Sequence, residues 1–138
     1  MKSVRIGAGL GFYGDAWEPI AASIERGGVQ FIASDHLAEL TLAILQKDRQ
    51  RDPGLGYARD VVPLLMKLWP LMRERGVRFV CNAGGLNPKA AAQAEGLDVD
   101  FRIASGQDLP WSDGHIDVVV RGATGRQPLP PLAVRGAA

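Results

Sequence analysis

Hydrophobic residues recur along the chain in two spacings, and together they predict strands separated by helices. Short apolar runs that end at glycine or polar residues indicate strands, and apolar residues repeated every three or four positions indicate helices. The strands predicted in this way are residues 4–6, 29–33, 77–81 and 99–104. The predicted helices are residues 16–26, 37–49, 59–75 and 88–94. Strands that alternate with helices favour an α/β fold.

Glycine and proline positions mark where these elements begin and end. Gly27 and Gly28 stop the first helix, and Gly76 stops the third. Pro70 lies inside the third helix and is expected to kink or break it, because proline has no amide hydrogen to donate. Strands joined through helices pair in parallel, so we predict an open, mostly parallel sheet flanked by helices, a Rossmann-like three-layer arrangement. In such sheets ligands bind beyond the carboxyl ends of the strands.

Composition narrows the class of protein. The chain has 138 residues, enough for one domain, of which 46% are hydrophobic and 22% charged. Sixteen basic and 15 acidic residues give a net charge of +1, which predicts neither a nucleic-acid partner nor an acidic membrane surface. No apolar stretch reaches the ~20 residues of a membrane-spanning helix, and residues 1–6 contain no secretory signal. Cys81 has no second cysteine to pair with, which agrees with a cytoplasmic protein.

The first predicted strand is followed by a run of glycines. Gly7, Gly9, Gly11 and Gly14 precede Asp15. Glycine lets a ligand approach the backbone closely, and free amide groups beside a helix N-terminus bind anions, so this loop is a candidate phosphate or carboxylate site. The alternative is a tight turn in which Asp15 caps the next helix. The run also fits the G-x-G-x-x-G pattern of dinucleotide-binding folds, although the charge of Asp15 would then lie beside the pyrophosphate.

Two acidic residues and a histidine follow the second predicted strand. Asp35 and Glu39 are four residues apart, the spacing of helical neighbours, and His36 follows Asp35 directly. These three side chains are candidates for general acid/base catalysis. Asp35 also stands where a dinucleotide site has its ribose-binding acid. The alternative is a helix start in which Ser34 or Asp35 is the N-cap and Glu39 is a solvated charge. No further residue with ligand spacing favours a metal site.

The third strand end combines two asparagines with two glycines. Asn82 follows the strand directly, and its amide is a candidate to bind a substrate carbonyl or oxyanion. Gly84 and Gly85 open the backbone to a ligand. Asn87 is predicted to cap a helix that starts at Pro88, and it completes the candidate ligand-binding residues of this loop.

Four segments carry motifs that occur together in one known family. They are Arg5-Ile6-Gly7-Ala8-Gly9 through Asp15, Asp35-His36-Leu37-Ala38-Glu39, Asp52-Pro53-Gly54-Leu55-Gly56-Tyr57, and Gly76-Val77 through Pro88. In this order they resemble the N-terminal region of the acyclic terpene utilisation (AtuA-like) family. The resemblance covers residues 3–96 and extends through Gln107-Asp108-Leu109. It implies a bacterial cytoplasmic protein that takes part in the breakdown of citronellol- and geraniol-like branched acyl compounds at the acyl-CoA stage, with no defined reaction and no assigned cofactor.

The later part of the chain departs from this family. Members of the family are several times longer, so we expect a short or truncated relative that lacks a C-terminal portion or pairs as a homo-oligomer. The resemblance divides the chain into an α/β domain, residues 1–109, and a divergent segment, residues 110–138. Proline, glycine and arginine are frequent from residue 121 onwards, and this composition predicts an irregular tail.

Two alternative functions remain open at this stage. Residues 103–120 resemble the stretch of class I methyltransferases in which an acid precedes a loop and an apolar strand, and the first glycine loop would then bind S-adenosylmethionine. Arg5 stands where those enzymes have an acidic residue, which weakens this alternative. The other alternative is a non-catalytic interaction module, because a sheet that lacks elements exposes apolar edges that favour pairing with another chain.

Overall fold

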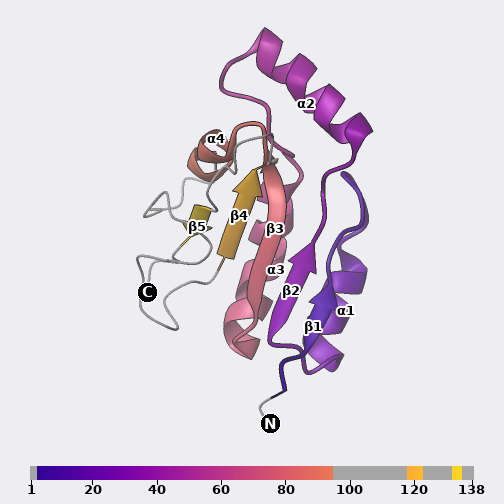
Figure 1. Ribbon diagram of the computed structural model, residues 1–138. Coiled ribbons are helices and arrows are strands. Elements are labelled where there is room, and N and C mark those ends of the chain that lie inside the picture. The colour runs from indigo at the N-terminus through magenta and orange to yellow at the C-terminus, as the bar shows by residue number, and fades with distance from the viewer. Residues whose placement is uncertain (1–2, 95–117, 123–131, 135–138) are drawn as a thin grey trace.

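The computed structural model describes residues 3–94, 118–122 and 132–134 (Figure 1). Its helices are α1 (Glu18–Arg26), α2 (Glu39–Arg51), α3 (Val61–Arg75) and α4 (Pro88–Gln93). Its strands are β1 (Ile6–Ala8), β2 (Phe31–Ser34), β3 (Arg78–Gly85), β4 (Val118–Gly122) and β5 (Leu132–Val134). Helices separate successive strands as far as β4, with α2 and α3 following one another between β2 and β3.

The strands form one sheet in the order β1-β2-β3-β4-β5. The first four strands are parallel, and β5 is antiparallel to β4. The predicted class, an open and mostly parallel α/β sheet with flanking helices, is therefore confirmed. The predicted strand at residues 99–104 lies outside the described residues, and residues 118–122 pair with β3 instead. The short strand β5 lies where the composition predicts an irregular tail, so that prediction is wrong for these three residues.

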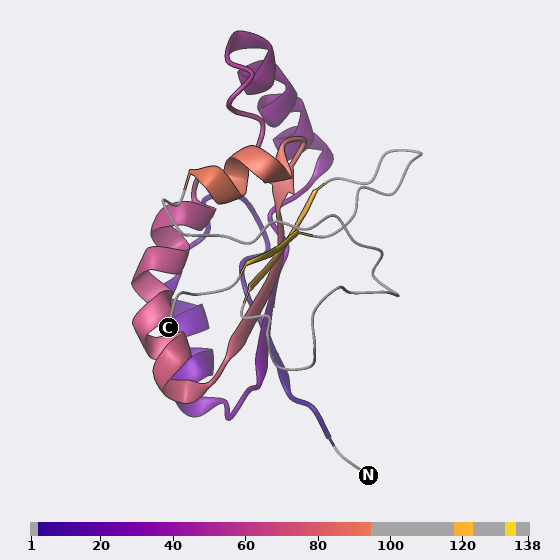
Figure 2. The same ribbon diagram turned by 90° about the vertical axis from the view of Figure 1, so that its left-hand side faces the viewer.

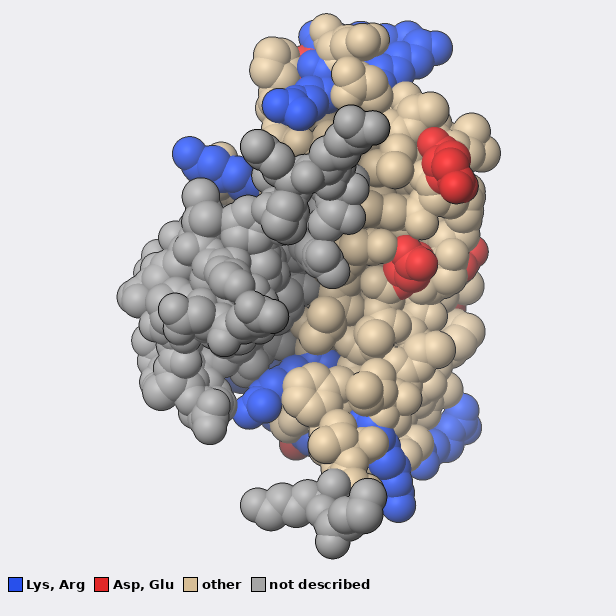
Figure 3. All heavy atoms as spheres, in the orientation of Figure 1, with Lys and Arg blue, Asp and Glu red and all other residues tan. Residues whose placement is uncertain are grey.

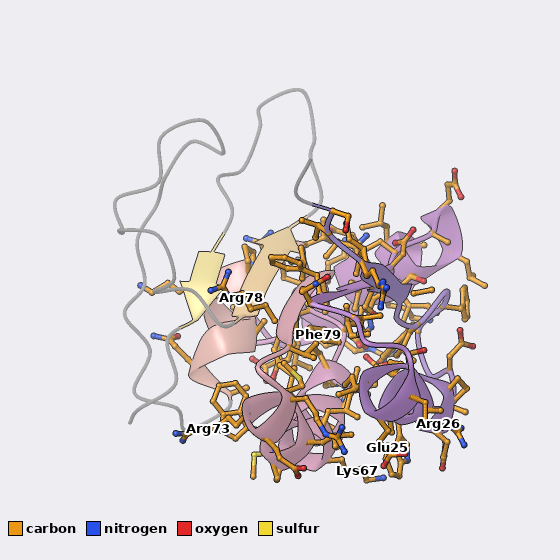
Figure 4. All side chains as sticks on the ribbon, turned by 90° about the horizontal axis from the view of Figure 1, so that it is seen from below. Glu25, Arg26, Lys67, Arg73, Arg78 and Phe79 are labelled. Atoms are coloured by element: carbon orange, nitrogen blue, oxygen red, sulfur yellow. The ribbon has the colours of Figure 1, made fainter. Side chains whose placement is uncertain are left out.

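The helices α1 and α3 lie together on one face of the sheet (Figure 2). Strands that follow one another in sequence order across a sheet, joined by right-handed crossovers, place their helices on the same side. Figure 4 shows the same layer from below, with Glu25, Arg26 and Lys67 on its outer surface. The helix α2 projects beyond the carboxyl ends of the strands (Figure 1). The other face of the sheet carries none of the described helices.

The core lies between the sheet and this helical layer. Alternate residues of β2 and β3 point into it, so Ile32 and Phe79 are fully buried. The helices contribute buried side chains at helical spacing, namely Ile20 and Ile24 from α1 and Val61, Leu64, Leu65, Leu68 and Met72 from α3. This core holds the carboxyl ends of the strands in fixed positions.

The helix boundaries differ from the sequence predictions at α3. The helix continues through Pro70 to Arg75, so of the predicted kink or break, the break is wrong. Proline removes the hydrogen bond to the carbonyl of Met66, four residues earlier. Both Pro70 and Met66 are exposed, so water can donate a hydrogen bond to that carbonyl in place of the missing amide. Gly76 ends the helix in the left-handed conformation, as its position predicts.

Candidate functional site

The loops that follow β1, β2 and β3 meet at the carboxyl edge of the sheet. Because β1 and β2 run in parallel, their ends lie side by side. Two backbone hydrogen bonds continue this pairing past the strands, from the Gly9 amide to the Ala33 carbonyl at 2.7 Å and from the Asp35 amide to the Leu10 carbonyl at 2.8 Å. The predicted glycine loop and the predicted acidic loop are therefore one structural unit.

A chain of polar contacts centred on His36 runs through this unit. The Leu10 amide donates to the Ser34 hydroxyl at 2.8 Å, and that oxygen lies 3.1 Å from His36 Nε2. His36 Nδ1 lies 3.5 Å from Asp60 Oδ1, and the other Asp60 oxygen accepts from the Gly14 amide at 2.7 Å. We call Ser34, His36 and Asp60 the His36 network. It ties both ends of the glycine loop to β2 and to the start of α3.

The His36 network has the residue types of a catalytic triad, but its burial points to a structural role. His36 is fully buried, and Ser34 is 7% exposed. The Ser34 oxygen already accepts a backbone amide and contacts the imidazole, so it is not free to attack a substrate. His36 Nδ1 and Asp60 Oδ1 face each other without a hydrogen bond to any other group, and a shift of a few tenths of an ångström would pair them.

Asp35 and Asn82 form a second polar pair at the same edge. Asn82 Oδ1 accepts from the His36 amide at 2.7 Å, and Asn82 Nδ2 donates to Asp35 Oδ1 at 2.6 Å. The Leu37 amide donates to the same Asp35 oxygen at 3.1 Å. The Asn82 amide is therefore committed to protein partners, whereas Asp35 is exposed and keeps its second carboxylate oxygen for solvent or a ligand.

The structure joins Asp35, His36 and Asn82, but it leaves Glu39 outside this cluster. Glu39 is exposed in the first turn of α2. Among the described residues, no hydrogen bond links it to the His36 network or to the Asp35–Asn82 pair. The N-cap of α2 is Ala38, with no side-chain hydrogen bond, so the prediction that Ser34 or Asp35 caps this helix is wrong. Those two side chains instead bind the Leu10 and Leu37 amides.

The glycine loop is closed by its own contacts rather than open to an anion. The Gly11 amide donates to Asp15 at 3.1 Å, and Gly14, with φ +91°, donates to Asp60. A Cβ at Gly9 would lie 2.5 Å from the Ser34 Cβ, so close packing requires glycine there. At Gly7, inside β1, a Cβ would lie 2.9 Å from an Ile32 methyl.

Asp15 does not cap α1, the role that the sequence suggested as an alternative to anion binding by the glycine loop. The helix α1 begins after Trp17, which makes no side-chain cap, so the prediction that Asp15 is the N-cap is wrong. Its carboxylate accepts a hydrogen bond from the Gly11 amide instead, and α1 starts two residues later than a cap at Asp15 would require. The strand β1 pairs only with β2 among the described strands. A dinucleotide site lies where the strand order reverses, so this position at the edge does not favour one.

The loop after β3 contacts the turn at residues 52–58 rather than the His36 network. Its candidate ligand-binding residues are Gly84, Gly85 and Asn87. Asn87 Nδ2 donates to the Pro53 and Leu55 carbonyls, both at 2.9 Å. Asn87 Oδ1 accepts from the Ala90 amide at 3.3 Å, which confirms the predicted cap of α4. A Cβ at Gly85 would lie 2.5 Å from a Leu45 methyl, and Gly84 is buried. In this structure these residues join two loops rather than line an open site.

Little in the sequence indicated that Ser34 and Asp60 would contact His36. Ser34 is the last residue of β2 on its inward face, where alternation alone identifies its position but not its partner. Asp60 lies 24 residues after His36, in the turn before α3, and only the folded chain brings the two together. No group of His, Cys, Asp or Glu suited to a metal ion occurs among the described residues.

Comparison with known proteins agrees with the motif order. The sequence matches the family described as acyclic terpene utilisation family protein AtuA over residues 4–104. No curated protein and no solved structure matches the chain significantly. In the described part of the chain, no helix is both long enough and apolar enough to cross a membrane. The matched region includes every element from β1 to α4 and hence all three loops of the carboxyl edge, and the chain belongs to the acyclic terpene utilisation (AtuA) family.

Proposed function

We propose that the protein acts in the breakdown of branched acyclic terpenoid acyl compounds and binds them as coenzyme A thioesters at the carboxyl edge of the sheet. Membership of the AtuA family supports a role in acyclic terpene utilisation. The observation that carries the proposal is the Asp35–Asn82 pair, an exposed carboxylate held in place where α/β sheets bind their ligands.

Asp35 is the residue we propose for acid/base chemistry. One of its oxygens is fixed by Asn82 and the Leu37 amide, so the other oxygen has a defined direction. A carboxylate in this state can accept a proton from water or from the carbon next to a thioester carbonyl. Asn82 is then a positioning residue, and the His36 network keeps the neighbouring glycine loop in place.

Positive charge near this edge supports a coenzyme A ligand. Lys47, Arg49 and Arg51 are exposed in the second half of α2. Figure 3 shows basic side chains gathered at the end of the molecule where α2 lies. Coenzyme A carries several negatively charged phosphate groups, which basic side chains attract. Salt screens this attraction, so the affinity for such a ligand falls as the ionic strength rises.

Thermal denaturation with and without ligand tests this proposal. Geranoyl- and citronelloyl-coenzyme A should raise the melting temperature more than coenzyme A or the free acids do, because only the thioesters offer both the acyl chain and the phosphates. Asp35→Asn and Asn82→Ala should reduce the shift. Glu25→Gln, an exposed carboxylate on the outer surface of α1, is the matched control and should leave the shift unchanged (Figure 4).

Two outcomes would count against the proposal. If the ligand raised the melting temperature of Asp35→Asn and Glu25→Gln by the same amount, Asp35 would not be part of the binding site. A shift with S-adenosylmethionine but with no thioester would favour the methyltransferase alternative, for which the strand order gives no support because β1 lies at the edge of the described sheet.

A further inference from the structure

The exposed side of α2 carries a row of side chains whose character changes along the helix. Its members are Leu40, Ile44, Lys47 and Arg51, and residues three or four positions apart lie on one side of an α-helix. Leu40 is 62% exposed and Ile44 is 40% exposed. Lys47 and Arg51 are exposed as well. We call these four residues the α2 row, which is apolar near the start of the helix and basic near its end.

The other sides of α2 are engaged with the fold. Its buried residues are Thr41 and Leu45. Each follows a member of the α2 row by one position, so its side chain points about a quarter turn away from that member. Arg49 lies on the side opposite the row, and its guanidinium donates to the Leu86 carbonyl at 3.1 Å. Arg49 therefore holds α2 to the loop after β3, and the α2 row is left facing solvent.

The charge that the α2 row presents is positive. Neither Lys47 nor Arg51 forms an ion pair with another described residue. Asp48 borders the row, but its side chain is only 19% exposed and its carboxylate pairs with Arg59 at 3.8 Å. Glu39 precedes the row and points about a quarter turn away from its first residue. The basic half of the row is therefore available to an anion.

The apolar half of the row is the half closer to Asp35 along the chain. Asp35 lies four residues before α2 begins, and the Leu37 amide between them donates to its carboxylate at 3.1 Å. Figure 1 shows α2 leading away from the carboxyl end of β2. From Leu40 to Arg51 the helix rises about 16 Å. A ligand that starts at Asp35 and follows α2 along this row meets apolar side chains first and basic side chains last.

We propose that the α2 row binds the coenzyme A part of the thioester, an inference that rests on the function proposed above. In coenzyme A, a long uncharged pantetheine arm that carries two methyl groups joins the thioester to the phosphates. The row has its groups in the same order. With the thioester at Asp35, the arm lies against Leu40 and Ile44, and the phosphates lie against Lys47 and Arg51.

Binding of coenzyme A itself, which has no acyl chain, tests the basic half of the row separately from Asp35. In titration calorimetry at low salt, Lys47→Gln and Arg51→Gln should each weaken binding about two- to fivefold, the range of an exposed charge pair. Added salt should weaken these variants less than it weakens the natural chain. Arg26→Gln removes an exposed charge from the outer surface of α1 and is the matched control, which should bind as the natural chain does (Figure 4).

A ligand without the arm tests the apolar half. Adenosine diphosphate has phosphates but no pantetheine, so Ile44→Ser should weaken coenzyme A about fivefold and leave adenosine diphosphate unchanged. Met66→Ser is the matched control, because Met66 is 62% exposed on α3, and it should change neither affinity. Circular dichroism of each variant confirms that it is folded.

The outcomes separate this inference from the proposed function. Unchanged affinity for coenzyme A in the double variant of Lys47→Gln and Arg51→Gln would overturn the inference, even if Asp35→Asn still weakens the thioester. An equal effect of Ile44→Ser on coenzyme A and adenosine diphosphate would overturn it as well. If the row variants weaken coenzyme A while Asp35→Asn leaves the thioester unchanged, the row is a coenzyme A site and Asp35 is not part of it. No binding of coenzyme A at millimolar concentration would overturn both proposals.

Discussion

The close approach of Gly9 to Ser34 gives a sharp prediction for the glycine loop. In Gly9→Ala the new methyl would lie 2.5 Å from the Ser34 Cβ and 2.8 Å from its Cα. The second of these atoms belongs to the backbone, so the strand end itself must move. Gly11→Ala is the matched control in the same loop, because its nearest neighbour would be an Asp15 oxygen at 3.7 Å, an ordinary contact.

The size of the effect follows from the contacts that the movement would disturb. Overpacking of this kind costs about 1–3 kcal/mol. Separating the loop from β2 also stretches the hydrogen bond from the Leu10 amide to Ser34, which contributes about 1 kcal/mol. We therefore expect Gly9→Ala to lower the free energy of unfolding by about 2–4 kcal/mol. Gly11→Ala should change it by less than about 1 kcal/mol in either direction.

Urea unfolding followed by circular dichroism measures both variants. A lower midpoint with an unchanged slope for Gly9→Ala would show a loss of stability in the folded state. Equal midpoints for Gly9→Ala and Gly11→Ala would refute the reasoning. The glycine at position 9 would then have to be explained by ligand access rather than by packing on Ser34.

Two further substitutions test other parts of the structure. Asn87→Ala removes the cap of α4 and both bonds to the Pro53 and Leu55 carbonyls, so it should cost about 2–3 kcal/mol in urea unfolding and speed hydrogen exchange in residues 52–58. An unchanged midpoint would contradict the role of Asn87 in joining the two loops. Pro70→Ala gives α3 an amide that can donate to the Met66 carbonyl and should raise stability by about 1 kcal/mol in thermal unfolding. If Pro70→Ala were less stable than the natural chain, the ring of Pro70 would have to make a stabilising contact, although the residue is exposed.

Much of the fold follows from local patterns in the sequence. The spacing of Ile20 and Ile24 identifies α1, and the apolar run that includes Phe79 identifies β3, because helices and strands bury side chains at different periods. Asn87 was identifiable as a cap because asparagine before a proline is a local signal. Residues 118–122 were the harder case, because the choice of a neighbour for β3 depends on contacts distant in sequence.

The candidate site was predicted in position but not in its internal contacts. Asp35, His36 and Asn82 lie where the carboxyl ends of parallel strands place them. The direction of the His36 side chain depends on Ser34, two residues earlier in the chain, and on Asp60, which lies beside His36 only when α3 is packed on the sheet. The sequence pattern therefore cannot separate a solvent-facing carboxylate, Asp35, from the fully buried imidazole beside it.

Titration of the isotope-labelled chain with geranoyl-coenzyme A, followed by amide NMR spectra, tests the central claim most directly. We expect the largest shifts at the carboxyl edge, in Asp35, His36 and the first turn of α2, and we expect Asp35→Asn to reduce them. Shifts confined to the opposite end of the strands, around Arg78 and Val29, or no shifts at all at millimolar ligand, would contradict a thioester site at this edge.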